Sequence, residues 1–110
     1  MNWKKLDSKE VFSEMLSNSF DSPQVLFKHS YRCSISSFAL SRMQNQAANI
    51  DYYLLDVIAQ REISNEVAQE FNVIHQSPQL LIIHHGKCIY NISHLSISDK
   101  KVEKQLALLR

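Results

Sequence analysis

The sequence contains very little glycine, proline or cysteine. Its 110 residues include one glycine, two prolines and two cysteines, with no internal repeat, linker or low-complexity segment. A structural disulfide is not expected in a reducing compartment, and two cysteines this far apart do not have the spacing of a zinc site. Any chemistry of these cysteines is therefore expected to be redox or nucleophilic.

An excess of charge and a long apolar run are also absent. The formal net charge is +1, and no arginine-rich stripe or alternation of aromatic and basic residues is present, which argues against a nucleic-acid partner. The longest apolar runs, such as residues 80–83, are too short to cross a bilayer, and the first five residues lack the apolar core of a signal peptide. We therefore expect a cytoplasmic protein with neither nucleic acid nor a membrane as partner.

The length and the hydrophobic content of 45% predict a single domain, residues 1–110, which can bury a core without cross-links. Asp7 and Glu10 have the spacing of a capping box and predict the start of a first helix. Further helices are predicted after Cys33, after residue 57 and from about Ser98. The residues at helical spacing, which are expected to face the core, are Val11, Phe12, Met15 and Leu16, then Ile35, Phe38, Ala39, Arg42 or Met43, and Ala47, then Ile63, Val67, Ala68 and Phe71, and finally Val102, Leu106 and Leu109.

Four apolar runs predict strands, at residues 25–27, 51–57, 79–84 and 88–92. The last two form a hairpin around Gly86, the only glycine, which lies where a tight turn needs a positive φ. The resulting order of helices and strands predicts an α/β fold with a central mixed sheet of four to five strands and helices on both faces. This plan is similar to that of the thioredoxin fold.

Cys33 lies at the point where an apolar strand ends and a helix begins. Free backbone N–H groups at the helix N-terminus and the positive charge of Arg32, with Lys28 and His29 nearby, would stabilise a thiolate, which is the nucleophilic form of cysteine. The alternative is that Cys33 is an ordinary small buried residue. Pro78, directly before the hairpin, is expected to be cis as in thioredoxin-like domains, although an ordinary trans proline is the alternative.

Several stretches resemble the monothiol bacilliredoxins of the YtxJ type, thioredoxin-fold proteins of bacteria that use bacillithiol as their low-molecular-weight thiol. The resemblance spans nearly the whole chain. It rests on residues 28–30 (Lys-His-Ser), on Cys33 with Ile35-Ser36, on residues 75–79 (His-Gln-Ser-Pro-Gln), on Gly86 and on Ser93-His94. The family loop reads Cys-Pro-Ile-Ser, whereas this chain has Ser34 in place of the proline, so the reactivity of Cys33 can differ from that of the family.

The resemblance implies a thiol-disulfide oxidoreductase that removes bacillithiol from mixed disulfides on oxidised proteins, with Cys33 as the catalytic nucleophile. Ser36 stands where a dithiol enzyme has its resolving cysteine, so the reductant must come from outside, as a second bacillithiol molecule. No bound cofactor or metal is expected; bacillithiol is the thiol co-substrate, and bacillithiolated proteins are the partners. The expected substrate-binding residues are Lys28, His29, Arg32, Ser36, Ser77 and Pro78.

The expected ligand contacts are the charges near Cys33 and the backbone beside Pro78. The basic residues would be counter-charges for the carboxylates of bacillithiol, or simply a solvated basic loop. The backbone of Ser77 beside Pro78 would pair with an extended thiol ligand as an added strand does. Cys88 is interpreted as buried or incidental rather than as a resolving thiol. His94 either hydrogen-bonds the sheet edge or approaches the site.

Two other classes of function remain open. A monothiol thioredoxin-like domain can hold an iron–sulfur cluster between two protomers with external thiol ligands, and a domain with an unreactive Cys33 would be a non-catalytic interaction module. The five histidines could suggest a metal site. His84 and His85 are adjacent on a predicted strand, however, and are expected to point to opposite faces.

Overall fold

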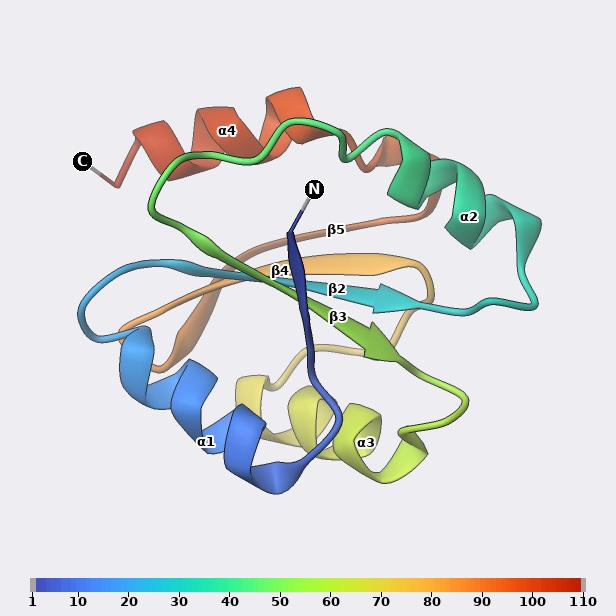
Figure 1. Ribbon diagram of the computed structural model, residues 1–110, viewed down its shortest axis with the longest axis horizontal. Helices are drawn as coiled ribbons and strands as arrows, with labels where there is room; N and C mark the ends of the chain where they lie inside the picture. Colours follow the sequence, from blue (N-terminus) through green and yellow to red (C-terminus); the bar gives the residue numbers. More distant parts are fainter. Residues whose placement is uncertain (1, 110) are drawn as a thin grey trace.

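The computed structural model describes residues 2–109 and places five strands in one mixed sheet between two layers of helices (Figure 1). The elements in chain order are β1 (Trp3–Lys5), α1 (Lys9–Asn18), β2 (Gln24–His29), α2 (Ser34–Ser41), β3 (Asp51–Asp56), α3 (Arg61–Phe71), β4 (Gln79–His84), β5 (Lys87–Ser93), the 3-10 turn η1 (His94–Ser96) and α4 (Asp99–Ala107). The strand order is β1-β3-β2-β4-β5, with β1, β2 and β3 parallel and β4 antiparallel to both neighbours. The predicted α/β class and mixed sheet are confirmed.

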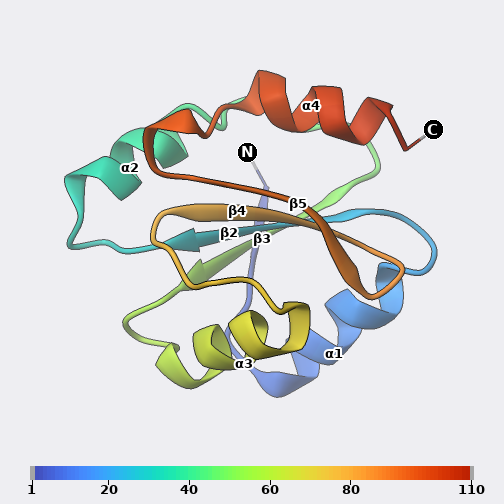
Figure 2. The same ribbon diagram turned by 180° about the vertical axis from the view of Figure 1, so that it is seen from behind.

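Helices α1 and α3 cover one face of the sheet, and α2 and α4 cover the other (Figure 1, Figure 2). Strand β2 lies at the centre of the sheet, and all of its residues are buried. Because successive side chains of a strand point to opposite faces, Leu26 packs in the core with α1 and α3, whereas Val25 and Phe27 pack in the core with α2 and α4. No helix within residues 2–109 is long and apolar enough to cross a membrane.

Helix α1 begins one residue later than its capping pattern predicts. Its N-cap is Ser8 rather than Asp7, because the hydroxyl of Ser8 accepts the backbone N–H of Val11 at 3.2 Å. At the other end of the chain, the predicted apolar stripe of α4 stops at Leu106. Leu109 lies beyond the end of that helix and is 36% exposed.

Helix α2 is shorter than predicted and buries a narrower stripe. Ala39 of the helix and Met43 just beyond its end are fully buried as expected, but Ile35 and Phe38 are 44% and 55% exposed, and Ala47 also lies outside the helix. An eight-residue helix presents few side chains to the sheet. Since apolar residues occur on both of its faces, periodicity alone does not reveal which face is buried.

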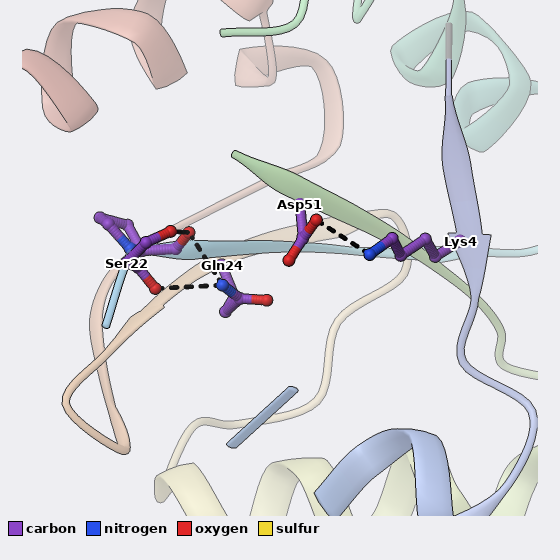
Figure 3. A network of polar contacts seen from close by, with 5 residues as sticks. Lys4, Ser22, Gln24 and Asp51 are labelled. Atoms are coloured by element: carbon purple, nitrogen blue, oxygen red, sulfur yellow. Dashed lines mark hydrogen bonds and ion pairs between the residues drawn. The ribbon is translucent and has the colours of Figure 1, made fainter. Parts of the chain in front are cut away.

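The edge strand β1 was not predicted, and its conformation depends on its neighbours. It pairs in parallel with β3, and the ring of Trp3 meets the rings of Phe27 and Tyr52 edge-on at centroid distances of 5.9 and 5.8 Å. Lys4 forms an ion pair with Asp51 of β3 at 2.9 Å (Figure 3). Since partly exposed ion pairs contribute little, the packing of Trp3 holds this strand in place.

The start of β2 is fixed by a buried polar side chain. Gln24 donates from Nε2 to the carbonyl oxygen of Ser22 at 3.0 Å and to that of Pro23 at 3.3 Å (Figure 3). Gln24 is paired with Asp51, the first residue of β3. These contacts therefore lie at the end of the parallel strands opposite to the end from which the chain leads to Cys33.

The hairpin of β4 and β5 closes with the turn predicted around Gly86. His85 and Gly86 have φ values of 53° and 73°, and positive φ at both central residues is the pattern of a type I′ turn. Their backbone N–H groups donate to the carbonyl and hydroxyl oxygens of Ser19, each at 2.9 Å.

The prediction that His84 and His85 point to opposite faces is wrong, because His85 lies in the turn and the ring centroids are 4.0 Å apart. Within residues 2–109, no group of three or more His, Cys, Asp or Glu side chains could hold a metal ion.

Replacing Gly86 by alanine is expected to lower the free energy of unfolding by about 1–2 kcal/mol. Its φ is +73°, and an added Cβ would lie 3.1 Å from Cζ of Phe20. Asparagine adopts positive φ more readily than alanine, so Gly86→Asn is expected to lose less. Urea denaturation of the three proteins measures the difference. An unchanged unfolding midpoint for Gly86→Ala would show that the turn is not strained by a side chain.

Candidate active site

Cys33 lies where the sequence predicts it, between β2 and α2. It is the N-cap residue of α2, with a φ of −114°, and its thiol is free and half-buried. Its backbone N–H donates to the carbonyl oxygen of Ser30 at 3.2 Å, and its own carbonyl oxygen accepts the N–H of Ser37 at 3.1 Å. Tyr31 and Arg32 of the same loop are exposed. The thiol therefore stands at the positive end of a helix, next to a surface arginine in the sequence.

Ser36 is turned inward and closes the loop that carries Cys33. It is fully buried; its Oγ accepts the N–H of Ser30 at 3.0 Å and lies 2.6 Å from Nδ1 of His29. A buried hydroxyl needs an acceptor for its proton, and Nδ1 is within reach when it is unprotonated. Burial lowers the pKa of His29, which favours this neutral ring. Ser36 thus ties the loop to β2, and its predicted contact with substrate stays a prediction.

Lys28 and His29 are adjacent in sequence but serve opposite faces of the sheet. His29 meets Ser36 of α2, whereas Nζ of Lys28 lies 2.9 Å from Nδ1 of His75 on the side of α3. Their side chains are 0% and 1% exposed, so neither presents a charge at the surface. Burial lowers the pKa of Lys28 from 10.5 to about 8. Of the three basic residues expected to meet a ligand, Arg32 is the one that is exposed.

Ser77 and Pro78 lie at the same end of the sheet as the Cys33 loop. Gln79, the first residue of β4, is paired with Lys28 near the end of β2, so the two loops extend from neighbouring strands (Figure 2). The Ser77–Pro78 peptide bond is cis, as predicted. Pro78 is buried, and Ser77 is half-buried with an Oγ that has no hydrogen-bond partner among the described residues.

Three side chains hold this loop: His75, already described, and Gln79, which were given no role in the prediction, and His94, which was predicted either to hydrogen-bond the sheet edge or to approach the site. Oε1 of Gln79 accepts the N–H of Gln76 at 3.4 Å, and its Nε2 donates to the carbonyl oxygen of Ile74 at 3.2 Å. Nε2 of His94 lies 2.9 Å from Oε1 of Gln76, and the backbone N–H of His94 donates to the carbonyl oxygen of Pro78 at 3.0 Å. All three lie in the stretches that carry the family resemblance, so the resemblance is the signal that could have pointed to them.

An open groove of about 710 Å³ runs beside α2. Trp3, His29 and Tyr31 contribute aromatic rings to it, and Ser37, whose N–H is bonded to Cys33, contributes a hydroxyl. The ring centroids of His29 and Tyr31 are 4.3 Å apart. The groove was missed from sequence because one of its walls is the strand β1, which was not predicted.

Comparison with models of known protein families finds one that matches most of this chain. The family model described as "Monothiol bacilliredoxin BrxC" matches residues 4–102. The chain belongs to the monothiol bacilliredoxin family. This membership confirms the resemblance, which was predicted from residues 28–30, Cys33 with Ile35-Ser36, residues 75–79, Gly86 and Ser93-His94.

Solved structures agree with the fold of this family member. A proposed oxidoreductase with a thioredoxin fold is 27% identical over 91% of this chain and 89% of that chain, with a TM-score of 0.81. Thioredoxins of Malassezia sympodialis and Trypanosoma brucei brucei are 16% and 14% identical over 97% and 98% of this chain and 90% of theirs, with TM-scores of 0.75 and 0.76. The predicted thioredoxin-like fold is confirmed, and family and fold together support a thiol redox role.

The second cysteine of the chain lies at the other end of the sheet. Cys88 is paired with Ile83 of β4, which is paired with Gln24 at the start of β2. The length of β2, roughly 17 Å, therefore separates Cys88 from the Cys33 end of the sheet. A disulfide needs Cα atoms within about 7 Å, and burial raises the pKa of the Cys88 thiol. Both observations favour the interpretation of Cys88 as a bystander.

Proposed function

We propose that this protein removes bacillithiol from protein mixed disulfides by a monothiol mechanism through Cys33. The observation that carries the proposal is the pair formed by Cys33 and Ser36. The N-cap residue of α2 carries a half-exposed thiol, and the residue three positions later is a fully buried serine that cannot form a disulfide. A cysteine in this setting can accept a thiol from another disulfide but cannot release it internally.

The reaction then proceeds by two thiol–disulfide exchanges. In the first, the Cys33 thiolate attacks the bacillithiol sulfur of the mixed disulfide; a disulfide forms between Cys33 and bacillithiol, and the repaired protein leaves as a thiolate that takes a proton from water. In the second, the thiolate of another bacillithiol attacks the adduct and releases Cys33 together with bacillithiol disulfide. The net reaction consumes one free bacillithiol: its sulfur is oxidised from thiol to disulfide, while the sulfur of the repaired protein is reduced from disulfide to thiol.

The surface around Cys33 offers contacts for such a ligand. Arg32 is an exposed cation for the carboxylates of bacillithiol, and the backbone of Ser77 can pair with an extended thiol. The groove lined by Trp3 and Tyr31 provides aromatic rings and hydroxyls for the remainder of the molecule. The proposed reaction needs bacillithiol and bacillithiolated proteins, which we expect in a reducing cytoplasm. We therefore propose that the protein is cytoplasmic.

Intact-mass spectrometry after mixing with a bacillithiolated protein near neutral pH tests the proposal. The wild type and Cys88→Ala are expected to gain one bacillithiol each, whereas Cys33→Ala gains none. If no adduct moves to the folded wild type, the proposed function fails. A visible absorbance band after anaerobic purification would then favour the iron–sulfur alternative, and a colourless, unreactive protein would favour a non-catalytic module.

A further inference from the structure

The side chain of Lys28 is buried in a way that the proposed chemistry does not use. It is 0% exposed, on the central strand, and it points to the side of the sheet away from α2. Among residues 2–109, the lysine–carboxylate ion pairs are those of Lys4 and Lys9. Lys28 is therefore a buried basic group whose hydrogen-bond partner is an imidazole, His75, rather than a carboxylate.

This arrangement is costly for folding. Burying an ammonium group without a counter-charge is unfavourable, and an apolar side chain of similar volume usually fits such a position better. Leu26, two residues earlier on the same face of β2, is an example of such a residue. Stability therefore does not explain why a lysine occupies this position.

The partner of Lys28 belongs to the loop that ends in Ser77 and Pro78. Nδ1 of His75 lies 2.9 Å from Nζ of Lys28 and 3.5 Å from Oγ of Ser64, a buried residue of α3. Burial and the charges of Lys28 and Arg61 lower the pKa of His75, so Nδ1 is an acceptor near neutral pH. The ring is therefore held at one nitrogen from inside the sheet.

On its other side, the loop that ends in Ser77 and Pro78 is held through Gln76, the residue after His75. Gln76 bonds His94, which follows β5, and Gln79 bonds backbone groups of both Gln76 and Ile74. The successive side chains of His75 and Gln76 thus bond partners that lie on opposite sides of the loop. Such directional bonds fix how a loop is rotated about its own axis, which apolar contacts do not do.

We propose that Lys28 and His75 are positioning residues, which fix the Ser77–Pro78 loop in the orientation that the substrate disulfide requires beside Cys33. This inference rests on the proposed function, since the loop is the surface along which a thiol ligand would lie. It assigns Lys28 to the loop rather than to the carboxylates of bacillithiol. A displacement of such a surface by a fraction of an ångström slows the transfer without changing the thiol itself.

The first test compares transfer rates in Lys28→Met, His75→Leu, the double variant and His75→Asn. Lys28→Met and His75→Leu are each expected to slow bacillithiol transfer to Cys33 about tenfold, and the double variant is expected to be no slower than either. The amide oxygen of His75→Asn can accept the bond from Lys28, so this variant is expected to stay within about twofold of the wild type. Lys5→Met, which removes an exposed charge, is the control for net charge and is expected to be unchanged.

Alkylation of Cys33 by iodoacetamide is measured in the same proteins and is expected to be unchanged within about twofold, because the thiol is not touched. Single variants as fast as the wild type would overturn the inference. So would effects that multiply in the double variant, since the two residues would then act separately. Slower alkylation that matches the slower transfer would also overturn it, because the effect would then run through the thiol.

A second readout does not depend on the proposed function. Amide hydrogen exchange at Gln76, whose N–H donates to Oε1 of Gln79, is expected to quicken about tenfold in Lys28→Met and His75→Leu and to return to the wild-type rate in His75→Asn. Unchanged exchange would overturn the inference even if transfer were slower. If the wild type transfers no bacillithiol, the proposed function fails, and hydrogen exchange alone decides whether the pair fixes the loop.

Discussion

A Ser36→Cys variant is expected to form a disulfide with Cys33 in place of the lasting bacillithiol adduct of the wild type. Cys33 is the N-cap of α2 and Ser36 lies on its first turn, three residues later. Residues at this spacing have Cβ atoms roughly 5–6 Å apart, and a small rotation of the first turn brings them to disulfide distance. A cysteine at position 36 would attack the adduct from within the protein, where its effective concentration far exceeds that of free bacillithiol.

Mass spectrometry distinguishes the two outcomes directly. After reaction with a bacillithiolated protein, the wild type carries one bacillithiol, whereas Ser36→Cys is expected to carry almost none and to have lost two hydrogens. Ser36→Ala is the matched control, because it removes the same hydroxyl but adds no thiol, and it should still accumulate the adduct. If Ser36→Cys accumulates the adduct like the wild type, Ser36 does not occupy the position of a resolving cysteine.

The same substitution should weaken the fold. The Oγ of Ser36 accepts the N–H of Ser30 and bonds Nδ1 of His29, and both partners are buried. A thiol is a poorer donor and acceptor than a hydroxyl, so about 1–2 kcal/mol of the free energy of unfolding should be lost in the reduced form of the variant. The monothiol character of the site and the stability of its loop therefore depend on one side chain.

Features set by the local order of the chain were predictable from sequence. Cys33 follows an apolar run and precedes a helix, Pro78 precedes a strand, and Gly86 separates two strands; each place in the fold follows from its immediate neighbours. The edge strand β1 escaped prediction because it is three residues long and two of them are lysines. Its extended form comes from pairing with β3, which lies far away in sequence.

The side chains around the site were less predictable, because their orientation depends on tertiary packing. Phe38 and Ile35 were expected in the core and are exposed, since α2 turns Ala39 toward the sheet instead. Lys28 was expected to be a counter-charge for the carboxylates of bacillithiol, a role that requires an exposed side chain. Strand alternation places it beside Leu26 rather than beside His29, and only the position of His75 in the folded chain shows what it contacts.

Replacing Lys28 by methionine is expected to raise the free energy of unfolding by about 2 kcal/mol near neutral pH. Burial lowers the pKa of Lys28 from 10.5 to about 8, so the ammonium group at neutral pH is less stable in the folded protein than in the unfolded chain. Methionine has a similar length and no charge to desolvate. The loss of the bond to His75 offsets only a small part of this gain. The exposed imidazole can bond water instead.

The advantage of Lys28→Met should shrink as the pH rises. Between pH 8 and 10.5 the unfolded chain holds the lysine proton more firmly than the folded protein does, so the stability of the wild type increases through this window. Below pH 8 both states are protonated and the cost of the buried charge is present in full. The other titrating groups are common to both proteins, so the difference between them isolates Lys28.

Urea denaturation of the wild type and Lys28→Met at pH 7 and pH 10 measures this difference. We expect a more stable variant at pH 7 and a clearly smaller gain at pH 10. A variant that is less stable at pH 7, or a gain that does not change with pH, would show that Lys28 is not a costly buried cation. If the variant is more stable and yet transfers bacillithiol more slowly, Lys28 lowers the stability of the fold while it keeps the Ser77–Pro78 loop in place for the reaction at Cys33.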